Sequence, residues 1–352
     1  MSDITKIDKN FIINTSVERD NIRVYSVKDE PFRVHGLIHE NGKYRRMPEG
    51  IARTVSPQVA SLHACCAGGR VRFKTDSPYI AISAKMEHVL RMPHFALTGV
   101  SGFDVYDGED FVKCFVPPFD FVDGYSAIYD FPTQKMREIT INFPLYADVC
   151  ELYVGLDANA RLDGASDYRG EAPVVYYGSS ITQGGCASRP GNAYEAIISR
   201  RLNIDHVNLG FSGSAKGEDE MMDYIASLDM SVFVYDYDYN APTVEHLLKT
   251  HERGFKKIRE AHPTLPIIML SRPTPTLEPK GYLERYEIIK QTYENARASG
   301  DKNVDLMCGT ELIKACSGDG TVDGVHPTDF GFHSMASAII PILEEILNDN
   351  KA

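Results

Sequence analysis

Alternating strand and helix patterns in the second half of the chain constrain the fold most. Continuous apolar runs predict buried strands at 174–178, 206–210, 231–238, 266–273 and 304–309. Helical patterns follow them at 191–203, 218–228, 243–262, 281–299 and 331–347. Apolar strands that alternate with helices form a mostly parallel sheet with helices on both faces. The sequence therefore predicts an α/β/α domain in this half.

Polar residues follow several of these strands. Ser179 and Ser180 come after the first strand, Gly213 after the second and Asn240 after the third, and DGVHP (323–327) precedes the last helix. Ligands bind open parallel sheets at the carboxyl ends of the strands, so we expect these residues to meet there. A serine, a base, a group that orients the base and donors for an oxyanion are what acyl transfer requires.

Asp323 and His326 are the most informative pair. In D-x-x-H on a tight loop, the carboxylate reaches the imidazole Nδ1–H and leaves Nε2 free for a serine. A lone D-x-x-H is common, and His326 before Pro327 would also suit a loop cap. The serine and asparagine at matching strand ends favour the catalytic interpretation, but they do not say which of Ser179 and Ser180 acts.

The first half of the chain has short strand patterns separated by turns. Between residues 32 and 156 alternating runs predict an antiparallel β-sandwich, with Asp107-Gly108 as a hairpin turn. The stretch 157–173 is polar and rich in small residues, as linkers are. We therefore predict an N-terminal β-sandwich over 1–165 and the α/β/α domain over 166–352.

Composition limits the partners. The net charge of −12 without Lys/Arg clusters argues against nucleic acid or an anionic membrane as partner. No apolar run is long enough for a transmembrane helix, and the start lacks a signal-peptide pattern, so we expect a cytoplasmic protein. The seven cysteines lack metal-like spacing, and His35, His39, His88 and His94 lie without nearby cysteines or paired acids, so no metal is expected.

Four blocks, in order, resemble the SGNH (GDSL-type) hydrolase superfamily: GSSIT, NLGFSG, DYDYN and DGVHP. The resemblance implies that Ser180 is the nucleophile, His326 its base and Asp323 the group that orients the base. It also implies an oxyanion hole made by the N–H groups of Ser180 and Gly213 and the side-chain amide of Asn240. Ser179 stands where the superfamily usually has Asp.

The segment SGFDVYDGEDFVKCFVPP resembles the G-x-D-L-Y stretch of a β-sandwich module found before some SGNH domains, with Val105 in place of Leu. This arrangement is similar to that of bacterial carbohydrate O-acyl esterases and a few acyltransferases. It implies a cofactor-free serine esterase that removes small O-acyl groups, acetyl in the first place, from a carbohydrate or related polyol. The alternatives are an acyltransferase with the same acyl-enzyme and a carbohydrate-binding protein with a vestigial triad.

Three further residues are candidates for substrate binding. Arg189, close to Ser180 in sequence, suits a polar or anionic acyl group or a sugar hydroxyl, or else a salt bridge or a contact that orders the loop. Arg272 lies at the end of the fourth strand and so faces the same edge of the predicted sheet. Asp238 lies at the end of the third strand and is either close to substrate or structural.

Overall fold

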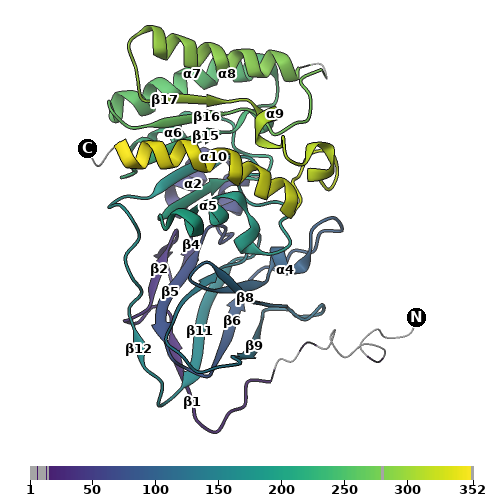
Figure 1. The fold of residues 1–352 in the computed structure, drawn as a ribbon. Helices are drawn as coiled ribbons and strands as arrows, with labels where there is room; N and C mark the ends of the chain where they lie inside the picture. The colour runs from purple at the N-terminus through teal and green to yellow at the C-terminus, as the bar shows by residue number, and fades with distance from the viewer. Residues whose placement is uncertain (1–5, 7–12, 14–15, 279–280, 350–352) are drawn as a thin grey trace.

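The computed structural model describes residues 6, 13, 16–278 and 281–349. In this part of the chain a parallel sheet occupies the centre of the C-terminal domain (Figure 1). Its strand order is β14-β13-β15-β16-β17. The strands are β13 (Val174–Gly178), β14 (His206–Gly210), β15 (Val232–Asp236), β16 (Ile267–Leu270) and β17 (Val304–Met307). The predicted parallel sheet is therefore confirmed.

Helices cover both faces of this sheet because each strand is apolar on both sides. Val174 and Tyr176 of β13 face one apolar core, and Val175 and Tyr177 face the other. The first core is closed by α5 (Tyr194–Leu202), α9 (Gly309–Leu312) and α10 (Asp329–Asp349). The second is closed mainly by α6 (Asp219–Ala226), α7 (Val244–Ala261) and α8 (Tyr282–Ala298).

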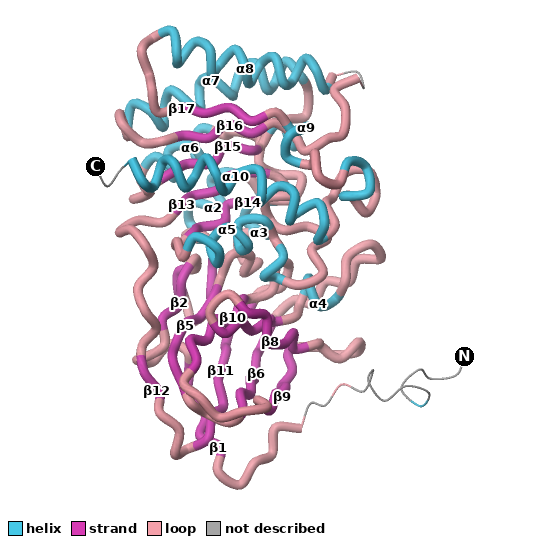
Figure 2. The backbone as a smooth tube through the Cα atoms, viewed as in Figure 1, coloured by secondary structure: helices cyan, strands magenta, loops and turns pink. Residues whose placement is uncertain are grey.

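Two antiparallel sheets form the N-terminal module, which lies below the C-terminal domain in Figure 2. One sheet has the order β1-β11-β6-β9, and the other has the order β12-β5-β10-β7-β8 with β2 beside β5. A single apolar core, which includes Phe73, Phe103 and Ile141, contains side chains from both. The predicted β-sandwich is confirmed. Its strands are β1 (Ile22–Ser26), β2 (Arg33–His35), β5 (Arg70–Thr75), β6 (Tyr79–Met86), β7 (Phe103–Asp107), β8 (Asp110–Phe115), β9 (Gly124–Asp130), β10 (Arg137–Asn142), β11 (Val149–Asp157) and β12 (Leu162–Asp163).

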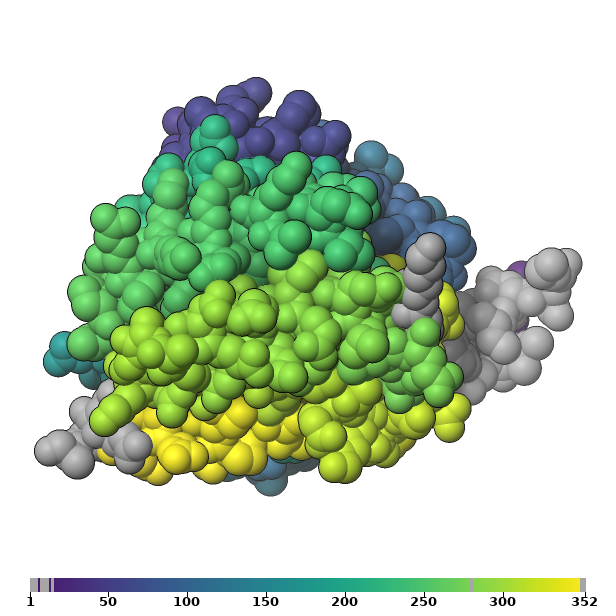
Figure 3. All heavy atoms as spheres, turned by 90° about the horizontal axis from the view of Figure 1, so that it is seen from above, coloured from purple at the N-terminus to yellow at the C-terminus, as the bar shows by residue number. Residues whose placement is uncertain are grey.

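One segment of the first half belongs to the core of the second. The short helices α2 (Glu49–Val55) and α3 (Pro57–Leu62) follow the hairpin of β3 (Ile38–Glu40) and β4 (Lys43–Arg45), and α2 packs beside both α3 and α6. Their residues Ala52 and Val59 are buried with the sheet core that α6–α8 close. The purple and indigo atoms of the early chain accordingly border the teal and green C-terminal domain in Figure 3. Sequence analysis predicted no helix here, because six or seven residues are too few to show helical periodicity.

Helix α10 is long and apolar enough to cross a membrane by length and composition alone. In the structure it lies along the sheet, and its apolar residues are inserted into the core beside α5, among them Phe332, Met335, Ile339 and Leu343, all fully buried. This is the packing of a core helix.

Candidate active site

The register of the parallel sheet brings three loops to one edge. Gly178, the last residue of β13, pairs with Gly210 of β14 on one side and with Asp236 of β15 on the other. The chain therefore leaves all three strands at the same level. Ser179 and Ser180 follow the first, and the loops that carry Gly213 and Asn240 follow the other two.

Ser180 lies in a tight turn directly after β13. The N–H of Gly185 donates to the carbonyl oxygen of Ser180 at 2.7 Å, and the N–H of Gln183 donates to that of Ser179 at 3.0 Å. The turn packs so closely on the sheet that a Cβ on Gly178 would lie 2.1 Å from Thr182 Oγ1. Glycine at the strand end is therefore required for this close approach.

A hydrogen-bonded relay connects this turn to the DGVHP loop. Ser180 Oγ lies 3.0 Å from His326 Nε2, and His326 Nδ1 lies 2.8 Å from Asp323 Oδ2. Asp323 Oδ1 also accepts the backbone N–H groups of Val325 at 3.0 Å and His326 at 2.8 Å. The carboxylate thus holds both the loop and the ring, and the second ring nitrogen is directed at Ser180 Oγ, as D-x-x-H predicted.

Hydrogen bonds stabilise the ionised form of Asp323. Partial burial raises the pKa of its carboxyl, but the hydrogen bonds from the backbone and ring of His326 and from the Val325 N–H outweigh that effect and hold the pKa at about 2. Asp323 is therefore an anion at neutral pH and can stabilise a positive charge on the imidazole.

Groups suited to donate to an oxyanion lie in Ser180 and in the two loops that leave the sheet at the same edge. In the described part of the chain, the backbone N–H groups of Ser180 and Gly213 donate to no protein acceptor. Gly213 has φ +65°, and a Cβ built there would meet nothing within 4 Å, so this backbone faces open space. Asn240, at the end of the 3-10 turn η3 (Asp238–Asn240), donates one amide N–H to the carbonyl oxygen of Phe211 at 2.8 Å. That bond fixes the side-chain amide beside the Gly213 loop.

Gln183 is a residue that sequence analysis did not single out. Its buried side chain accepts the N–H of Ser212 at 3.0 Å and donates to the carbonyl oxygen of Leu145 at 3.4 Å. It therefore ties the turn of Ser180 to the Gly213 loop and to the N-terminal module. Its sequence position in the turn is the only available signal, and that signal does not reveal these partners.

The N-terminal module forms a wall beside the relay. Helix α4 (Leu97–Val100) packs so closely on the segment after Cys186 that a Cβ on Gly99 would lie 2.1 Å from the carbonyl oxygen of Ala187. Just before α4, the exposed ring of His94 lies 5.8 Å from the ring of His326, centre to centre. The module is therefore part of the surroundings of Ser180.

Arg189 is placed in the junction between the two domains. Its Nη1 lies 3.0 Å from Asp104 Oδ2 and also donates to the Tyr106 hydroxyl. Its guanidinium stacks over Phe111, with Cζ 4.0 Å from the ring centre. Asp104 is fully buried and also accepts the N–H of Gly191 at 2.8 Å. Of the interpretations left open by the sequence, the structure shows the salt bridge.

Arg272 and Asp238 are partners of each other. Asp238 is 1% exposed, and its Oδ2 accepts the backbone N–H of Arg272 at 3.3 Å. Burial raises the pKa of Asp238 to about 6, although the charge of Arg272 opposes that shift. The Arg272 guanidinium is stacked between the rings of Tyr239 and Tyr282, at 3.7 and 4.0 Å from their centres. The Asp238 carboxylate lies below the surface and holds the backbone of Arg272, so in this structure it is not exposed to a bound substrate.

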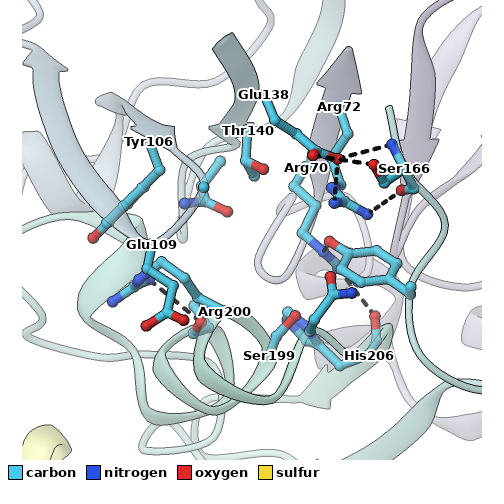
Figure 4. Close-up of a pocket in the computed structure, with 15 residues that line it drawn as sticks. Arg70, Arg72, Tyr106, Glu109, Glu138, Thr140, Ser166, Ser199, Arg200 and His206 are labelled. Carbon is cyan, nitrogen blue, oxygen red and sulfur yellow. Dashed lines mark hydrogen bonds and ion pairs between the residues drawn. The ribbon is translucent and has the colours of Figure 1, made fainter. Parts of the chain in front are cut away.

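A cavity of about 330 Å³ lies between the module and α5, away from the relay (Figure 4). It is lined at one end by His206, which pairs with Val174 at the amino end of β13, the opposite end from Ser180. Two of its arginines already have carboxylate partners, Arg70 with Asp205 and Arg72 with Glu138. The cavity belongs to the domain junction, and sequence analysis gave no sign of it.

Family models match both halves of the chain. Residues 171–344 match the GDSL-like lipase/acylhydrolase family, and residues 22–162 match the GxDLY module described as the N-terminus of SGNH-type esterases. No curated protein sequence matches the chain.

Several solved structures share the fold over most of their length. A proposed GDSL-like lipase from Bacteroides ovatus is 27% identical with a TM-score of 0.83, covering 93% of this chain and 98% of its own. A salicylyl-acyltransferase from a tetracycline biosynthetic pathway is 19% identical with a TM-score of 0.76, covering 94% and 98%. An acetyl xylan esterase from the rumen bacterium Butyrivibrio proteoclasticus is 12% identical with a TM-score of 0.60, covering 93% and 99%.

The GxDLY match falls on the β-sandwich, and the acylhydrolase match that follows it falls on the α/β/α domain. The chain therefore belongs to the SGNH (GDSL-type) hydrolase superfamily, as an ester hydrolase with an N-terminal module of the G-x-D-L-Y type.

Proposed function

We propose that this protein is a serine esterase that removes small O-acyl groups, acetyl in the first place, from a carbohydrate or related polyol. The observation that carries the proposal is the relay: Ser180 Oγ, His326 and Asp323 are joined by contacts of 3.0 and 2.8 Å at the carboxyl end of the sheet. This is the arrangement in which an imidazole takes the proton of a serine nucleophile.

In the proposed first step, Ser180 Oγ attacks the ester carbonyl carbon while its proton passes to His326 Nε2. Negative charge on the carbonyl oxygen is stabilised by the N–H groups of Ser180 and Gly213 and by the amide of Asn240, and each such donor contributes about 3 kcal/mol. The C–O bond to the alcohol then breaks as His326 returns the proton to the leaving oxygen. Water repeats the sequence on the acyl-enzyme, which releases the acid and restores Ser180. No metal or organic cofactor takes part in these steps.

The substrate class is supported by the relatives and by the module. Among the solved structures of this fold are an acetyl xylan esterase and a family two carbohydrate esterase from Clostridium thermocellum in complex with cellohexaose. The α4 wall places the N-terminal module beside Ser180, so the module can take part in the choice of the alcohol. An oligosaccharide ester or a smaller polyol ester is therefore the proposed partner.

An acyltransferase is the second candidate, favoured by the similarity to a salicylyl-acyltransferase over nearly the whole chain. The acyl-enzyme is the same in both reactions, and only the acceptor differs. Product analysis distinguishes them: incubation with an acyl donor and a candidate alcohol yields free acid from an esterase and a new ester from a transferase.

The test of the proposed nucleophile uses two neighbouring serines. Ser180→Ala should abolish turnover of nitrophenyl acetate and of acetylated oligosaccharides, and labelling by a serine-directed phosphonate should disappear. Ser179→Ala is the matched control, because Ser179 Oγ accepts the N–H of Ile181 at 3.1 Å and has no contact with His326 among the hydrogen bonds of the described residues, so this variant should keep its activity. Activity that persists in Ser180→Ala but is lost in Ser179→Ala overturns the assignment. A wild-type protein that reacts with neither ester nor phosphonate favours a binding protein with a vestigial triad.

A further inference from the structure

Three potential metal ligands converge beside the relay. His94, Cys186 and His326 each offer one ligand atom, and these atoms all lie within 4.8 Å of one another. They come from the loop before α4, the turn after Ser180 and the DGVHP loop. Because these segments are far apart in the sequence, residue spacing could not predict the cluster. Cys186 adopts the left-handed backbone conformation, with φ +78°, as the turn returns toward His326.

The donor set suits a borderline-soft divalent cation. Imidazole nitrogen and thiolate sulfur are the ligands that Zn²⁺ prefers, at about 2.0–2.1 and 2.3 Å, which places tetrahedral donors about 3.3–3.6 Å apart. The ligand atoms therefore have to move closer together by up to about 1.5 Å to take the ion. His94 is exposed on a surface loop, so its ring can turn to make this adjustment. Three protein ligands leave the fourth position for water.

We propose that His94, Cys186 and His326 form an inhibitory site for a cation of the Zn²⁺ class. On binding, the S–H bond of Cys186 breaks, its proton leaves to solvent and the sulfur bonds to the metal. His94 and His326 each supply a ring-nitrogen lone pair, and no oxidation or reduction takes place.

Binding is incompatible with the relay. His326 uses both ring nitrogens in it, Nε2 toward Ser180 and Nδ1 toward Asp323. A metal that occupies Nε2 removes the group that accepts the serine proton, and one that occupies Nδ1 removes the contact that orients the ring. Either mode stops acyl-enzyme formation, so metal concentration controls the activity of the site.

A second cluster, two of whose residues lie on the same loop as His94, serves as contrast. The possible ligands Glu87, His88 and Asp148 also lie close together. However, Asp148 already accepts the N–H groups of Glu87 and His88 and contacts the His88 ring at 2.8 Å, and Glu87 is paired with Lys43. Its carboxylates are therefore engaged. His88, six residues before His94, provides a matched control.

Binding is tested without substrate, by titration of the metal-free full-length protein with Co²⁺ as an optical probe. We expect a cobalt–thiolate charge-transfer band in the wild type that Zn²⁺ displaces, and no such band in Cys186→Ser. This readout does not depend on turnover, so it distinguishes failure of this inference from failure of the proposed function. Absence of the band in the wild type overturns the inference.

Inhibition is tested with nitrophenyl acetate and Zn²⁺, each variant being compared with its own rate in a chelator. Loss of one ligand should raise the Zn²⁺ concentration for half-inhibition at least about tenfold in His94→Gln and in Cys186→Ser. His88→Gln should be inhibited like the wild type. Equal sensitivity in all four proteins contradicts the inference, because the metal then acts through His326 alone or at another place.

Discussion

Replacement of Arg189 by methionine separates a structural role from substrate binding. Methionine keeps a long side chain over the Phe111 ring and removes the charge that is paired with Asp104. Asp104 is fully buried, and loss of one partner of a buried ion pair lowers the free energy of unfolding by about 3–5 kcal/mol.

Protonation of Asp104 limits that loss. Burial already raises the pKa of Asp104, while Arg189 and the hydrogen bonds from Asn142 and Gly191 oppose the shift. Without Arg189 the Asp104 carboxyl takes up a proton in the folded state. Protonation at pH 7 of a carboxyl whose pKa in the unfolded chain is about 3.9 costs about 4 kcal/mol. We therefore expect a loss of about 3–4 kcal/mol at pH 7. Since the folded variant holds a proton that the unfolded chain does not, the loss shrinks as the pH falls.

The assay is thermal unfolding at pH 7 and pH 5, together with steady-state kinetics. A chain of 352 residues that unfolds as one unit has an unfolding entropy of about 0.7 kcal/mol/K, so the midpoint at pH 7 should fall by about 4–6 °C. Arg201→Met, on the exposed side of α5, is the control and should shift it by less than about 1 °C. Asp104→Asn, added to Arg189→Met, should restore part of the loss. An unchanged midpoint with a raised KM refutes this reasoning and assigns Arg189 to substrate.

Two further changes test the oxyanion donors and a buried acid. Asn240→Ala should lower kcat about 10²–10³-fold with little change in KM, because its amide acts only when charge develops on the carbonyl oxygen; a change in KM alone would make Asn240 a substrate ligand. Burial raises the pKa of Glu195 from 4.5 to about 8, so the folded protein holds a proton that the unfolded chain releases, and stability falls as the pH rises from about 4.5 to 8. Glu195→Gln removes this effect and should stabilise the protein by about 3 kcal/mol at pH 7 but hardly at all near pH 4.5. Thermal melts at both pH values check it, and an equal shift at the two values would contradict the sign.

The sequence predicted those parts of the site that depend on local spacing and on the sheet. Asp323 and His326 are three residues apart, so their contact is set within one loop. The meeting of Ser180 with the Gly213 and Asn240 loops follows from the rule that parallel strands end at one edge. These features require no knowledge of side-chain packing between distant segments.

Features that depend on contacts between the halves were not predicted. Arg189 lies near Ser180 in sequence, which suggested substrate, but its partner Asp104 is 85 residues away and in another domain. The positions of His94 and Cys186 beside His326 likewise depend on how the module docks. Docking follows from the complementarity of two folded surfaces, for which a linear pattern carries no signal.

The α2–α3 segment has a consequence for how such proteins evolve. Ala52 and Val59 from the early chain complete the core on one face of the parallel sheet. The C-terminal domain therefore does not have a core made of its own residues alone. Recombination at the linker around residue 165 would transfer an α/β domain without part of its own interior. Exchange of modules among relatives would therefore have to keep this early segment matched to the sheet it covers, which favours inheritance of the two halves as one unit.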